Sequence, residues 1–379
     1  MIKVLIDPQT FNDQKFGGIS RYYTELYQQF RNNDQTEVVL PLLFTDNIHY
    51  KESPLFKESF QHKYSFLIRF GKIFRPFLPR KLKKKNDRNL LALLEKGDFD
   101  VFIPSYYDPY FLPHLTKPFV LTIHDMIHEL FPQYFPNDDP TIANKKLLME
   151  KATRIIAISQ NTKADILKVY PHISESKINI VNMAYSISDH PDLELHLPDL
   201  YLLFVGNRSV YKNFGFTLRA VAPILKSNPD LFFVCAGGNP FTPEELSMID
   251  QLGLSRQLVQ QNFHDDELSA YYRRSQCFIF PSEYEGFGIP VLEAMASGCP
   301  VILPYYSSFP EVAGDAGLYF ELNNAEDLRA KVAYLLADTD SRSLYIAKGT
   351  EQAKKFSWSK TANETLEVLY KAIGDTKES

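Results

Sequence analysis

The sequence contains few cysteines, and their spacing shows no pairing pattern. Only three occur, Cys235, Cys277 and Cys299, and each stands in an apolar stretch. Small secreted proteins that depend on disulfides have more cysteines at closer spacing. We therefore expect these thiols to fill the core of a protein from a reducing compartment.

The sequence also lacks long apolar runs and an excess of positive charge. No run approaches the roughly 18 residues that span a bilayer. The first residues, Met1–Asp7, form a strand-like pattern without a secretory signal, so we expect a cytoplasmic protein. The net charge of −5 disfavours nucleic acid as a partner.

The remaining composition is that of a folded protein. Hydrophobic residues make up 45% of the chain and charged residues 23%, so extensive disorder is not expected. A length of 379 residues favours two domains or one large domain.

Short apolar segments alternate with longer segments of helical periodicity. This alternation predicts parallel β-sheets with crossover helices. The predicted strands are Lys3–Ile6, Val38–Leu43, Val101–Pro104, Phe119–Ile123, Arg154–Ile158, Ile178–Val181, Tyr201–Val205, Leu231–Ala236, Val259–Asn262, Cys277–Phe280, Pro300–Leu303 and Leu318–Phe320. The predicted helices are Ile19–Asn32, Asn161–Tyr170, Phe214–Ser227, Glu267–Ser275, Pro290–Ser297, Ala325–Ala337 and Lys360–Ala372. We expect Ser159 to cap the second of these helices.

Each half of the chain is therefore predicted to form a Rossmann-like unit. Residues 186–200 contain several prolines and aspartates, and this composition predicts the linker between the halves. The last predicted helix follows the aromatic residues Phe356 and Trp358.

The most informative motif runs from Glu285 to Gly298. Glu285 and Glu293 bracket a Gly-x-Gly turn, and Pro290 and Gly298 suit the start and the end of a short helix. The turn glycines let backbone N–H groups approach a ligand, and a helix N-terminus attracts anions. Such a loop can hold a charged, hydroxyl-rich molecule such as a nucleotide sugar. The helix dipole alone also favours a glutamate in the first turn.

This motif, with the following segments Cys299–Ile302 and Phe309–Ala316, resembles the signature of retaining glycosyltransferases of the GT4 type. Glu285 and Glu293 match the Glu-x7-Glu pattern of that family. The resemblance covers nearly the whole chain and is strongest from Tyr201 to Phe320.

The resemblance implies a GT-B fold, an α/β architecture of two Rossmann-like domains with parallel sheets facing an interdomain cleft. Residues 1–190 would form the acceptor-binding domain, with the C-terminal helix, residues 358–379, packing back on it. Residues 191–357 would form the domain that binds the nucleotide-sugar donor.

Arg208 and Lys212 follow the predicted strand Tyr201–Val205, at the edge where ligands of open α/β folds bind. Arginine can clamp phosphate oxygens with two N–H groups, and lysine acts as a movable charge. Two cations at this spacing are equally typical of a solvated surface. The resemblance implies that both hold the donor diphosphate, although the family often spaces them one residue further apart.

Paired glycines, Gly17 and Gly18, follow the first strand and lead into a predicted helix. By itself the pair is typical of an ordinary loop. The resemblance implies that the pair faces the cleft. It also implies that Phe263 and His264 line the pocket for the nucleotide base.

His124 and His128 stand four residues apart after the predicted strand Phe119–Ile123. On a helix this spacing would resemble that of a zinc hydrolase, but Asp125 replaces the usual glutamate base and no third ligand stands at a standard spacing. A structural role at the strand end is a further alternative. The resemblance implies that His124 contacts the donor sugar while Asp125 orients its imidazole.

The implied function is transfer of a sugar from a nucleotide-diphosphate donor, such as a UDP- or GDP-sugar, to a hydroxyl group with retention at the anomeric carbon. Cations and amides aimed at the departing diphosphate would stabilise the transition state, without a metal ion or another cofactor. The implied catalytic residues are Glu285, His124, Arg208 and Lys212. The implied donor-binding residues are Glu293, on the ribose, and Gly286, Phe287, Gly288, Gly17, Gly18, Phe263 and His264.

Two other classes of protein remain as alternatives. A sugar-nucleotide epimerase or a phosphorylase shares the fold, but the sequence shows no lysine motif for the pyridoxal phosphate of a phosphorylase. A non-catalytic sugar-nucleotide-binding protein is the second alternative, which the intact Glu285, Glu293 and Arg208 disfavour.

Residues 66–85 carry many lysines and arginines, no acidic residue and several phenylalanines. Such a stretch could lie at an anionic membrane surface, beside a polyprenyl-linked acceptor of surface-polysaccharide synthesis. A solvated helix packed by its apolar face is an equal alternative, because Pro76 and Pro79 break any long amphipathic helix.

Overall fold

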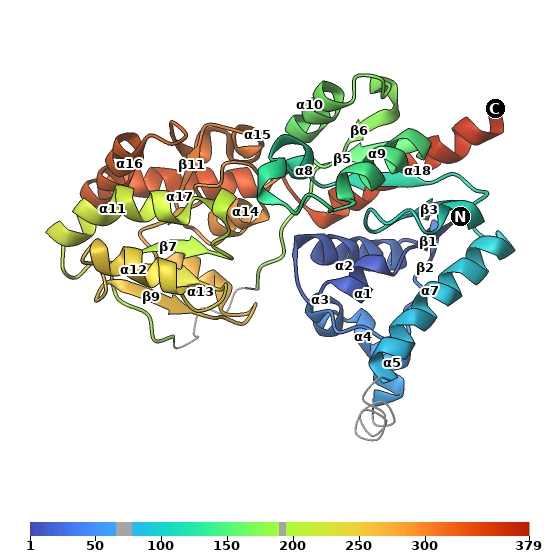
Figure 1. The fold of residues 1–379 in the computed structure, drawn as a ribbon, viewed down its shortest axis with the longest axis horizontal. Coiled ribbons are helices and arrows are strands. Elements are labelled where there is room, and N and C mark those ends of the chain that lie inside the picture. The colour runs from blue at the N-terminus through green and yellow to red at the C-terminus, as the bar shows by residue number, and fades with distance from the viewer. Residues whose placement is uncertain (66–77, 189–194, 379) are drawn as a thin grey trace. The chain divides into compact units, whose positions relative to one another are not determined.

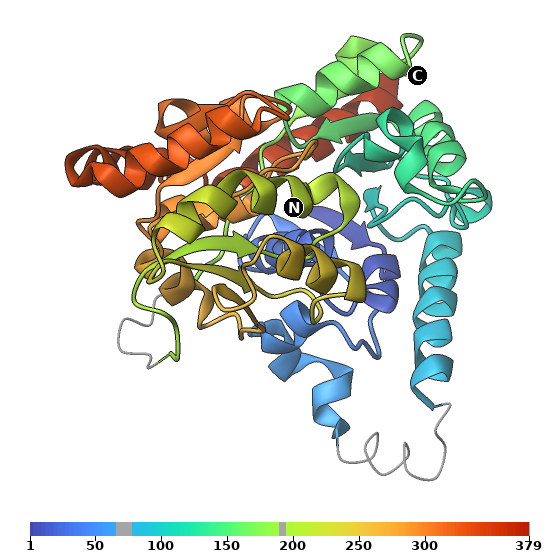
Figure 2. The same ribbon diagram turned by 60° about the vertical axis from the view of Figure 1, so that its left-hand side comes forward.

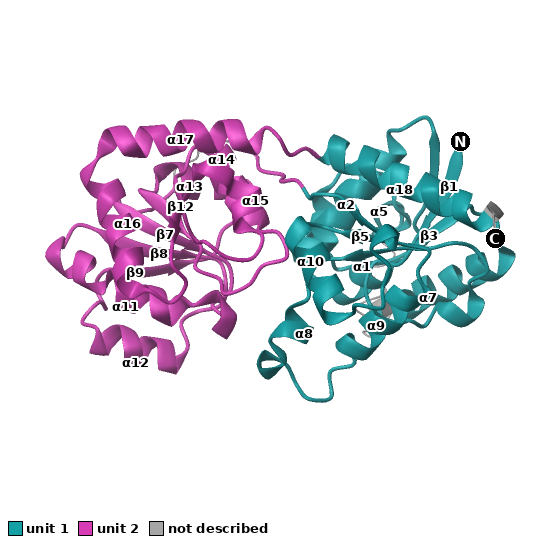
Figure 3. Ribbon diagram, turned by 90° about the horizontal axis from the view of Figure 1, so that it is seen from above, with its two compact units in different colours: residues 1–183, 358–379 teal, residues 184–357 magenta. Residues whose placement is uncertain are grey.

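The computed structural model describes residues 1–65, 78–188 and 195–378. The chain divides into two compact units (Figure 3). Unit 1 contains residues 1–183 and 358–379, and unit 2 contains residues 184–357. The division falls between Met183 and Ala184, a few residues before the boundary predicted from the sequence.

The strands of unit 1 pair in parallel throughout, as the alternating pattern predicted. They form two three-stranded sheets in the orders β2-β1-β3 and β4-β5-β6, and a parallel bridge between Phe102 and Phe119 links them. The strands are β1 (Ile2–Ile6), β2 (Thr36–Val39), β3 (Val101–Ile103), β4 (Val120–Ile123), β5 (Arg154–Ala157) and β6 (Ile178–Ile180). Every residue of β3 and β4 is buried, which explains their continuous apolar sequences.

The helices of unit 1 include several that the sequence did not predict. Figure 2 shows the longest of these, α7, as one continuous helix. The helices are α1 (Gln9–Asp13), α2 (Gly18–Arg31), α3 (Ile48–Glu52), α4 (Leu55–Glu58), α5 (Phe60–Lys63), α7 (Leu78–Lys96), α8 (Ile127–Leu130), α9 (Thr141–Lys151), α10 (Gln160–Val169) and α18 (Trp358–Glu378) (Figure 1). The predictions for α2 and α10 are confirmed to within one residue at each end.

The C-terminal helix α18 packs on unit 1. Its Asp375 carboxylate accepts two hydrogen bonds from the Arg154 guanidinium of β5, at 2.6 and 2.9 Å. The Thr361 hydroxyl donates to the Asn182 carbonyl oxygen at 2.8 Å. These contacts join the end of the chain to residues that precede unit 2.

Unit 2 contains one six-stranded parallel sheet in the order β12-β11-β10-β7-β8-β9. Its strands are β7 (Tyr201–Val205), β8 (Phe232–Ala236), β9 (Leu258–Gln261), β10 (Cys277–Ile279), β11 (Val301–Pro304) and β12 (Gly317–Phe320). Its helices are α11 (Phe214–Ser227), α12 (Pro243–Gln251), α13 (Leu268–Arg274), α14 (Ile289–Ala296), α15 (Phe309–Ala313), α16 (Ala325–Ala337) and α17 (Thr339–Ala353). Helix α11 packs beside α16, and α14 packs beside α17 (Figure 3).

The core of unit 2 confirms the expectation for the cysteines. Cys235, Cys277 and Cys299 are free and buried. Burial raises the pKa of the Cys299 thiol to about 12, so this thiol stays protonated and behaves as an apolar side chain.

The strand prediction was wrong at one place in unit 1. The predicted strand Val38–Leu43 lies too far along the chain, because β2 ends at Val39. Pro41 has no backbone N–H to donate to a neighbouring strand, which is a physical reason for the early end.

None of the described helices is long and apolar enough to cross a membrane. Residues 66–77 of the basic stretch lie outside the described residues, and α7 begins at Leu78.

We expect the substitution Gly298→Ala to lower the free energy of unfolding by about 1 kcal/mol. Gly298 follows α14 with a φ of +73°, and an added Cβ would meet only the Ile346 side chain at 3.7 Å, an ordinary contact. The cost therefore comes from the left-handed backbone. Urea unfolding measures the change. Gly374→Ala in α18 is the control, because that backbone is helical and an added Cβ would meet nothing within 4 Å. Equal losses in the two variants would contradict the assignment.

Candidate active site

The order of strands in unit 2 reverses between β7 and β10. The chain runs outward from β7 to β8 and β9, then returns to the other side of β7 with β10 and continues to β11 and β12. Open α/β sheets bind ligands beyond the carboxyl ends of the strands at such a reversal. The loops that follow β7 and β10 carry Lys212 and Glu285. The topology therefore brings these two predicted residues to one edge of the sheet.

Lys212 and Glu285 form an ion pair at this edge. Their side chains are only 15% and 16% exposed. The Lys212 ammonium also lies 5.0 Å from the ring centres of Tyr211 and Phe280. The Glu283 N–H donates to the Tyr211 carbonyl oxygen at 2.8 Å, which ties the two loops together. The pair is therefore held by both loops and is partly shielded from water.

Two serines after β11 hold the backbone at Glu285, and the sequence did not reveal them. The Ser307 hydroxyl donates to the Glu285 carbonyl oxygen at 2.6 Å and accepts from the Glu285 N–H at 3.2 Å. The Ser308 hydroxyl donates to the same carbonyl at 2.9 Å. Ser307 has a φ of +55°, a strained value for a residue with a side chain. The hydrogen bonds of Ser307 and Ser308 hold the backbone that carries Glu285.

The segment between the two predicted glutamates has the local structure expected from its glycines. Gly288 caps α14 with a φ of +95°, and Pro290 is the second helical residue rather than the first. Phe287 is buried and packs edge-to-face on Phe356. Glu293 lies on α14 and is only 3% exposed.

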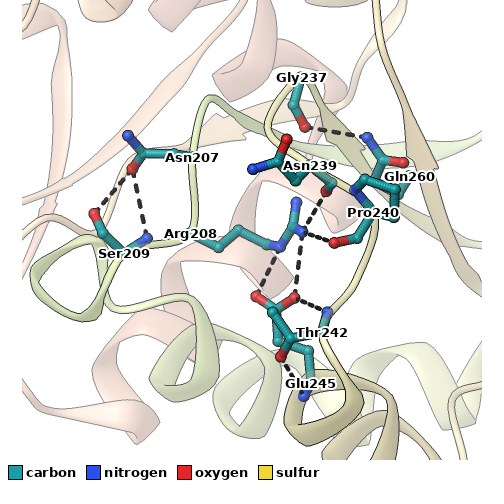
Figure 4. A network of polar contacts seen from close by, with 9 residues as sticks. All are labelled: Asn207, Arg208, Ser209, Gly237, Asn239, Pro240, Thr242, Glu245 and Gln260. Carbon is teal, nitrogen blue, oxygen red and sulfur yellow. Dashed lines mark hydrogen bonds and ion pairs between the residues drawn. The ribbon is translucent and has the colours of Figure 1, made fainter.

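Arg208 belongs to a different network of unit 2, shown in Figure 4. Its guanidinium donates to both oxygens of Glu245, at 2.8 and 3.2 Å, and to the carbonyl oxygens of Asn239 and Pro240, at 2.6 and 3.2 Å. The same Glu245 carboxylate accepts from the Thr242 N–H at 2.8 Å and completes the cap of α12. Arg208 therefore fixes the loop between β8 and α12.

The two predicted cations thus have separate carboxylate partners. Lys212 pairs with Glu285, and Arg208 pairs with Glu245, a residue that the sequence did not single out. The Arg208 side chain is 5% exposed and also lies over the rings of Phe214 and Phe241. Within the described residues, one guanidinium nitrogen of Arg208, NH1, has no hydrogen-bond partner.

Phe263 and His264 follow β9 and lie near the end of β8. A Cβ added at Gly237 would lie 3.0 Å from the Phe263 ring, so this close approach requires glycine. His264 is exposed, and its N–H donates to the Glu267 carboxylate at 2.7 Å, just before α13. The Phe263 ring therefore lies beside the turn that follows β8.

In unit 1, His124 follows β4 and is 6% exposed. Its ring lies edge-to-face against Tyr22 and Tyr23, with ring centres 5.3 and 5.9 Å away. The backbone N–H of His124 donates to the Tyr107 hydroxyl at 3.0 Å. Burial lowers the pKa of His124 to about 4, so the imidazole is neutral at pH 7.

The alternative of a zinc pair at His124 and His128 is not supported by the geometry. His124 precedes α8, so the two residues do not share a helix face. His128 stacks on Phe135, and its Nε2 lies 3.8 Å from the Asp139 carboxylate. In the described part of the chain, no three His, Cys, Asp or Glu side chains gather closely enough to hold a metal ion.

Three other predicted positions of unit 1 have clear local roles. Gly17 has a φ of +153° immediately before α2, which begins at Gly18. The Asp125 carboxylate accepts from the Ile127 N–H at 3.1 Å, at the start of α8. The Ser159 hydroxyl accepts from the Thr162 N–H at 2.9 Å, and the prediction that Ser159 caps α10 is confirmed.

Comparison with known proteins identifies the family. Residues 16–187 match the family model described as Glycosyltransferase Family 4, and residues 187–352 match the model described as Glycosyl transferases group 1. Together the two models cover both units. The chain belongs to the GT4-type glycosyltransferases.

Relatives of this transferase include enzymes of polysaccharide assembly. The O-antigen chain mannosyltransferase B of Escherichia coli is 27% identical over 379 aligned residues, which cover 94% of this chain and 96% of the relative. The serotype-specific mannosyltransferase WbdA of Escherichia coli is 29% identical over 279 residues, or 69% of this chain. That alignment covers 34% of WbdA, so the transferase matches about a third of that relative.

A solved structure shares the fold of the transferase. The crystal structure of Anabaena Alr3699/HepE in complex with UDP and glucose matches with a TM-score of 0.71 at 16% identity, over 98% of this chain and 99% of that one. The fold is therefore GT-B, an α/β fold with two Rossmann-like units of parallel sheet.

We expect Glu245→Gln to lower the free energy of unfolding of the transferase by about 2 kcal/mol, because the buried Arg208 guanidinium loses its charged partner. Glutamine keeps an acceptor oxygen for the Thr242 N–H, so the cap of α12 remains. Urea unfolding measures the change. Glu244→Gln is the control, because Glu244 is the exposed neighbour in the same helical turn. A loss no larger than that of the control would show that the Arg208 network is not a source of stability.

Proposed function

We propose that the transferase moves a sugar from a nucleotide-diphosphate donor to a hydroxyl group of a saccharide or lipid-linked acceptor, with retention at the anomeric carbon. The observation that carries this proposal is the Lys212–Glu285 pair at the strand reversal of unit 2. A cation and a carboxylate in contact at that edge match the two ends of the reacting bond, which become a diphosphate anion and a positively charged sugar ring.

Donor binding would change the partner of Lys212. In the free transferase the ammonium is paired with Glu285, and an incoming diphosphate carries more negative charge than one carboxylate. The ammonium would then shift toward the phosphate oxygens, and Glu285 would face the sugar. Both new contacts strengthen as charge separates in the transition state, which is the requirement for catalysis.

The other donor contacts follow from unit 2. Amides of the turn Gly286, Phe287 and Gly288 would bind phosphate oxygens, and Glu293 would accept from the ribose hydroxyls. Phe263 and His264 would line the base pocket. Arg208 would act by holding the loop before α12.

These assignments need no divalent metal, because Lys212 and the backbone amides supply positive potential where the leaving group forms. In unit 1, the resemblance gives His124 a contact with the donor sugar and Gly17 and Gly18 a place beside it. The neutral state of the His124 imidazole supports that role, because a cation there would oppose the charge that develops on the sugar.

The names of the relatives guide the choice of substrates. Both relatives from Escherichia coli are mannosyltransferases, and one acts on the O-antigen chain. We propose that the transferase acts in the synthesis of a surface polysaccharide. Nucleotide-activated mannose is the first donor to test, and UDP- and GDP-sugars as a set should be compared by thermal shift.

We expect Glu285→Gln to lower the turnover of sugar transfer at least tenfold, about 1.4 kcal/mol of barrier. The amide has the shape of the carboxylate but cannot stabilise a positively charged sugar ring. Release of the nucleoside diphosphate with the donor found by thermal shift measures the turnover. Glu326→Gln, an exposed glutamate at the start of α16, is the control and should keep wild-type turnover.

An unchanged turnover in Glu285→Gln would remove Glu285 from the mechanism. Nucleotide binding without transfer by the wild-type protein, across the donors and saccharide acceptors tested, would favour the non-catalytic alternative.

Peripheral contact with an anionic membrane is a further part of the proposal. Lys81, Lys84 and Lys85 are exposed on α7. Lys83 differs from them, because its ammonium donates to the Asn12 carbonyl oxygen at 2.8 Å and lies 3.4 Å from Asp46. A row of exposed lysines attracts anionic lipid head groups. This contact would hold the transferase at the cytoplasmic face, beside a polyprenyl-linked acceptor.

We expect the triple reversal Lys81→Glu, Lys84→Glu and Lys85→Glu to weaken binding to vesicles that contain anionic lipid, because each lysine near the surface contributes about 1 kcal/mol. Vesicle co-sedimentation at low salt measures the binding. The matched control reverses three exposed lysines of unit 2, Lys348, Lys354 and Lys355. Equal binding by the α7 variant and the wild-type protein would reject the membrane contact.

A further inference from the structure

Helix α9 of unit 1 carries a lysine whose side chain is completely buried. Lys145 is 0% exposed, and its ammonium contacts the Glu129 carboxylate at 3.0 Å. Glu129 is itself only 2% exposed in its side chain. The next lysine on the helix, Lys146, is exposed and is an ordinary surface residue by comparison. A buried ammonium requires a reason, because lysine is almost never fully buried unless it is paired.

Stability alone is a weak reason for this pair. Removing two charges from water costs several kcal/mol per ion, and apolar residues of similar size often fill such a place equally well. Burial also raises the pKa of Glu129, which shows that the site disfavours its charged form. We therefore attribute this buried pair to the local backbone conformation that it holds in place.

The geometry that Lys145 specifies is that of the loop after β4. Its ammonium donates to the Asp125 carbonyl oxygen at 3.1 Å and lies 3.9 Å from the Asp125 carboxylate. On the other side of His124, the Tyr107 hydroxyl accepts the His124 N–H at 3.0 Å. Lys145 also lies 5.1 Å from the centre of the Tyr107 ring. The backbone is therefore held on both sides of His124 by two side chains that contact each other.

The same groups set the charge of His124. Tyr22 and Tyr23 from α2 pack on its ring, the Tyr107 hydroxyl accepts from its backbone N–H, and Asp125 and Lys145 are the nearby charges. Burial favours the neutral imidazole, the Lys145 charge favours it further, and the Asp125 charge opposes it. Within the described residues, the buried Nε2 of His124 has no hydrogen-bond partner.

We infer that Lys145 and Glu129 are positioning residues that hold His124 in the orientation needed for sugar transfer. This inference rests on the proposed function, since it gives His124 its task at the donor sugar. Lys145 and Glu129 themselves touch no substrate. Lys145 acts through the Asp125 carbonyl, the Tyr107 ring and the electrostatic potential at His124, and Glu129 acts by holding the Lys145 ammonium.

The test compares two variants of the full chain with one control. Lys145→Met with Glu129→Gln removes both charges together, so that no buried charge is left unpaired. Tyr107→Phe removes only the hydroxyl that accepts the His124 N–H and loosens the loop from the other side. Lys146→Met is the control, because it removes a lysine from the same helix at an exposed position. Circular dichroism and a thermal melt establish that each variant is folded.

The first readout is the NMR titration of the His124 ring, assigned with His124→Gln. In the wild-type protein and in Lys146→Met we expect His124 to titrate near pH 4. In the double variant we expect an upward shift, because the positive charge of Lys145 is gone. A double variant that is folded and titrates like the wild type would overturn the inference.

The second readout is transfer kinetics. We expect kcat to fall about tenfold in the double variant and in Tyr107→Phe, because small displacements of a positioned group slow the chemical step. The KM for the donor should stay within about twofold, because these residues do not bind it. Wild-type kcat in both folded variants would overturn the inference, and so would an equal loss in Lys146→Met. If the double variant fails to fold, Tyr107→Phe decides by the same kinetic criteria. If the wild-type protein transfers no sugar, the proposed function fails, while the titration still tests how Lys145 acts on His124.

Discussion

The pairing of Lys212 with Glu285 is the interaction that joins the loops at the strand reversal of unit 2. It exists because β7 and β10 are neighbours although they are far apart in the chain, so their following loops meet at one edge of the sheet. The hydrogen bond from the Glu283 N–H to the Tyr211 carbonyl closes the two loops on each other. Ser307 and Ser308 reach the same backbone from the loop after β11. Three consecutive strands of the sheet thus fix one carboxylate.

A second network of hydrogen bonds, around Arg208, holds the loop that follows β8. Arg208 lies on the same loop as Lys212, but its side chain extends toward the loop after β8. There its guanidinium donates to Glu245 and to two backbone carbonyl oxygens. Glu245 has two tasks, since it also caps α12. The sequence suggested that Arg208 is available for phosphate, but in the structure its guanidinium holds this loop. Arg208 and Lys212 carry the same charge, and they differ in the carboxylate with which each is paired.

The sequence was sufficient for elements whose signal is local. Helices α11 and α16 and strand β7 have the predicted bounds, because apolar periodicity and flanking turn residues define them. Helix α12 was missed although Thr242 and Glu245 form a capping box, a signal present in the sequence. Helix α17 has mostly exposed or half-buried residues, so its periodicity was weak. The partners Glu245, Ser307 and Lys145 could not be predicted, because each contact joins residues from separate elements and only the fold brings them together.

The Lys212–Glu285 and Lys145–Glu129 pairs differ in burial, and the roles that we propose for them follow from that difference. The Lys212 and Glu285 side chains are 15% and 16% exposed, so in the proposed mechanism a diphosphate can compete with Glu285 for the ammonium. After this exchange the Glu285 carboxylate is not left as an isolated charge in an apolar core. The Lys145 and Glu129 side chains are 0% and 2% exposed. Separating them would therefore leave an unpaired charge buried in the protein. In the proposed mechanism, Lys212 and Glu285 exchange partners during the reaction, whereas Lys145 and Glu129 stay paired. A reactive contact and a fixed support can therefore be built from the same two residue types, and the depth of burial decides between them.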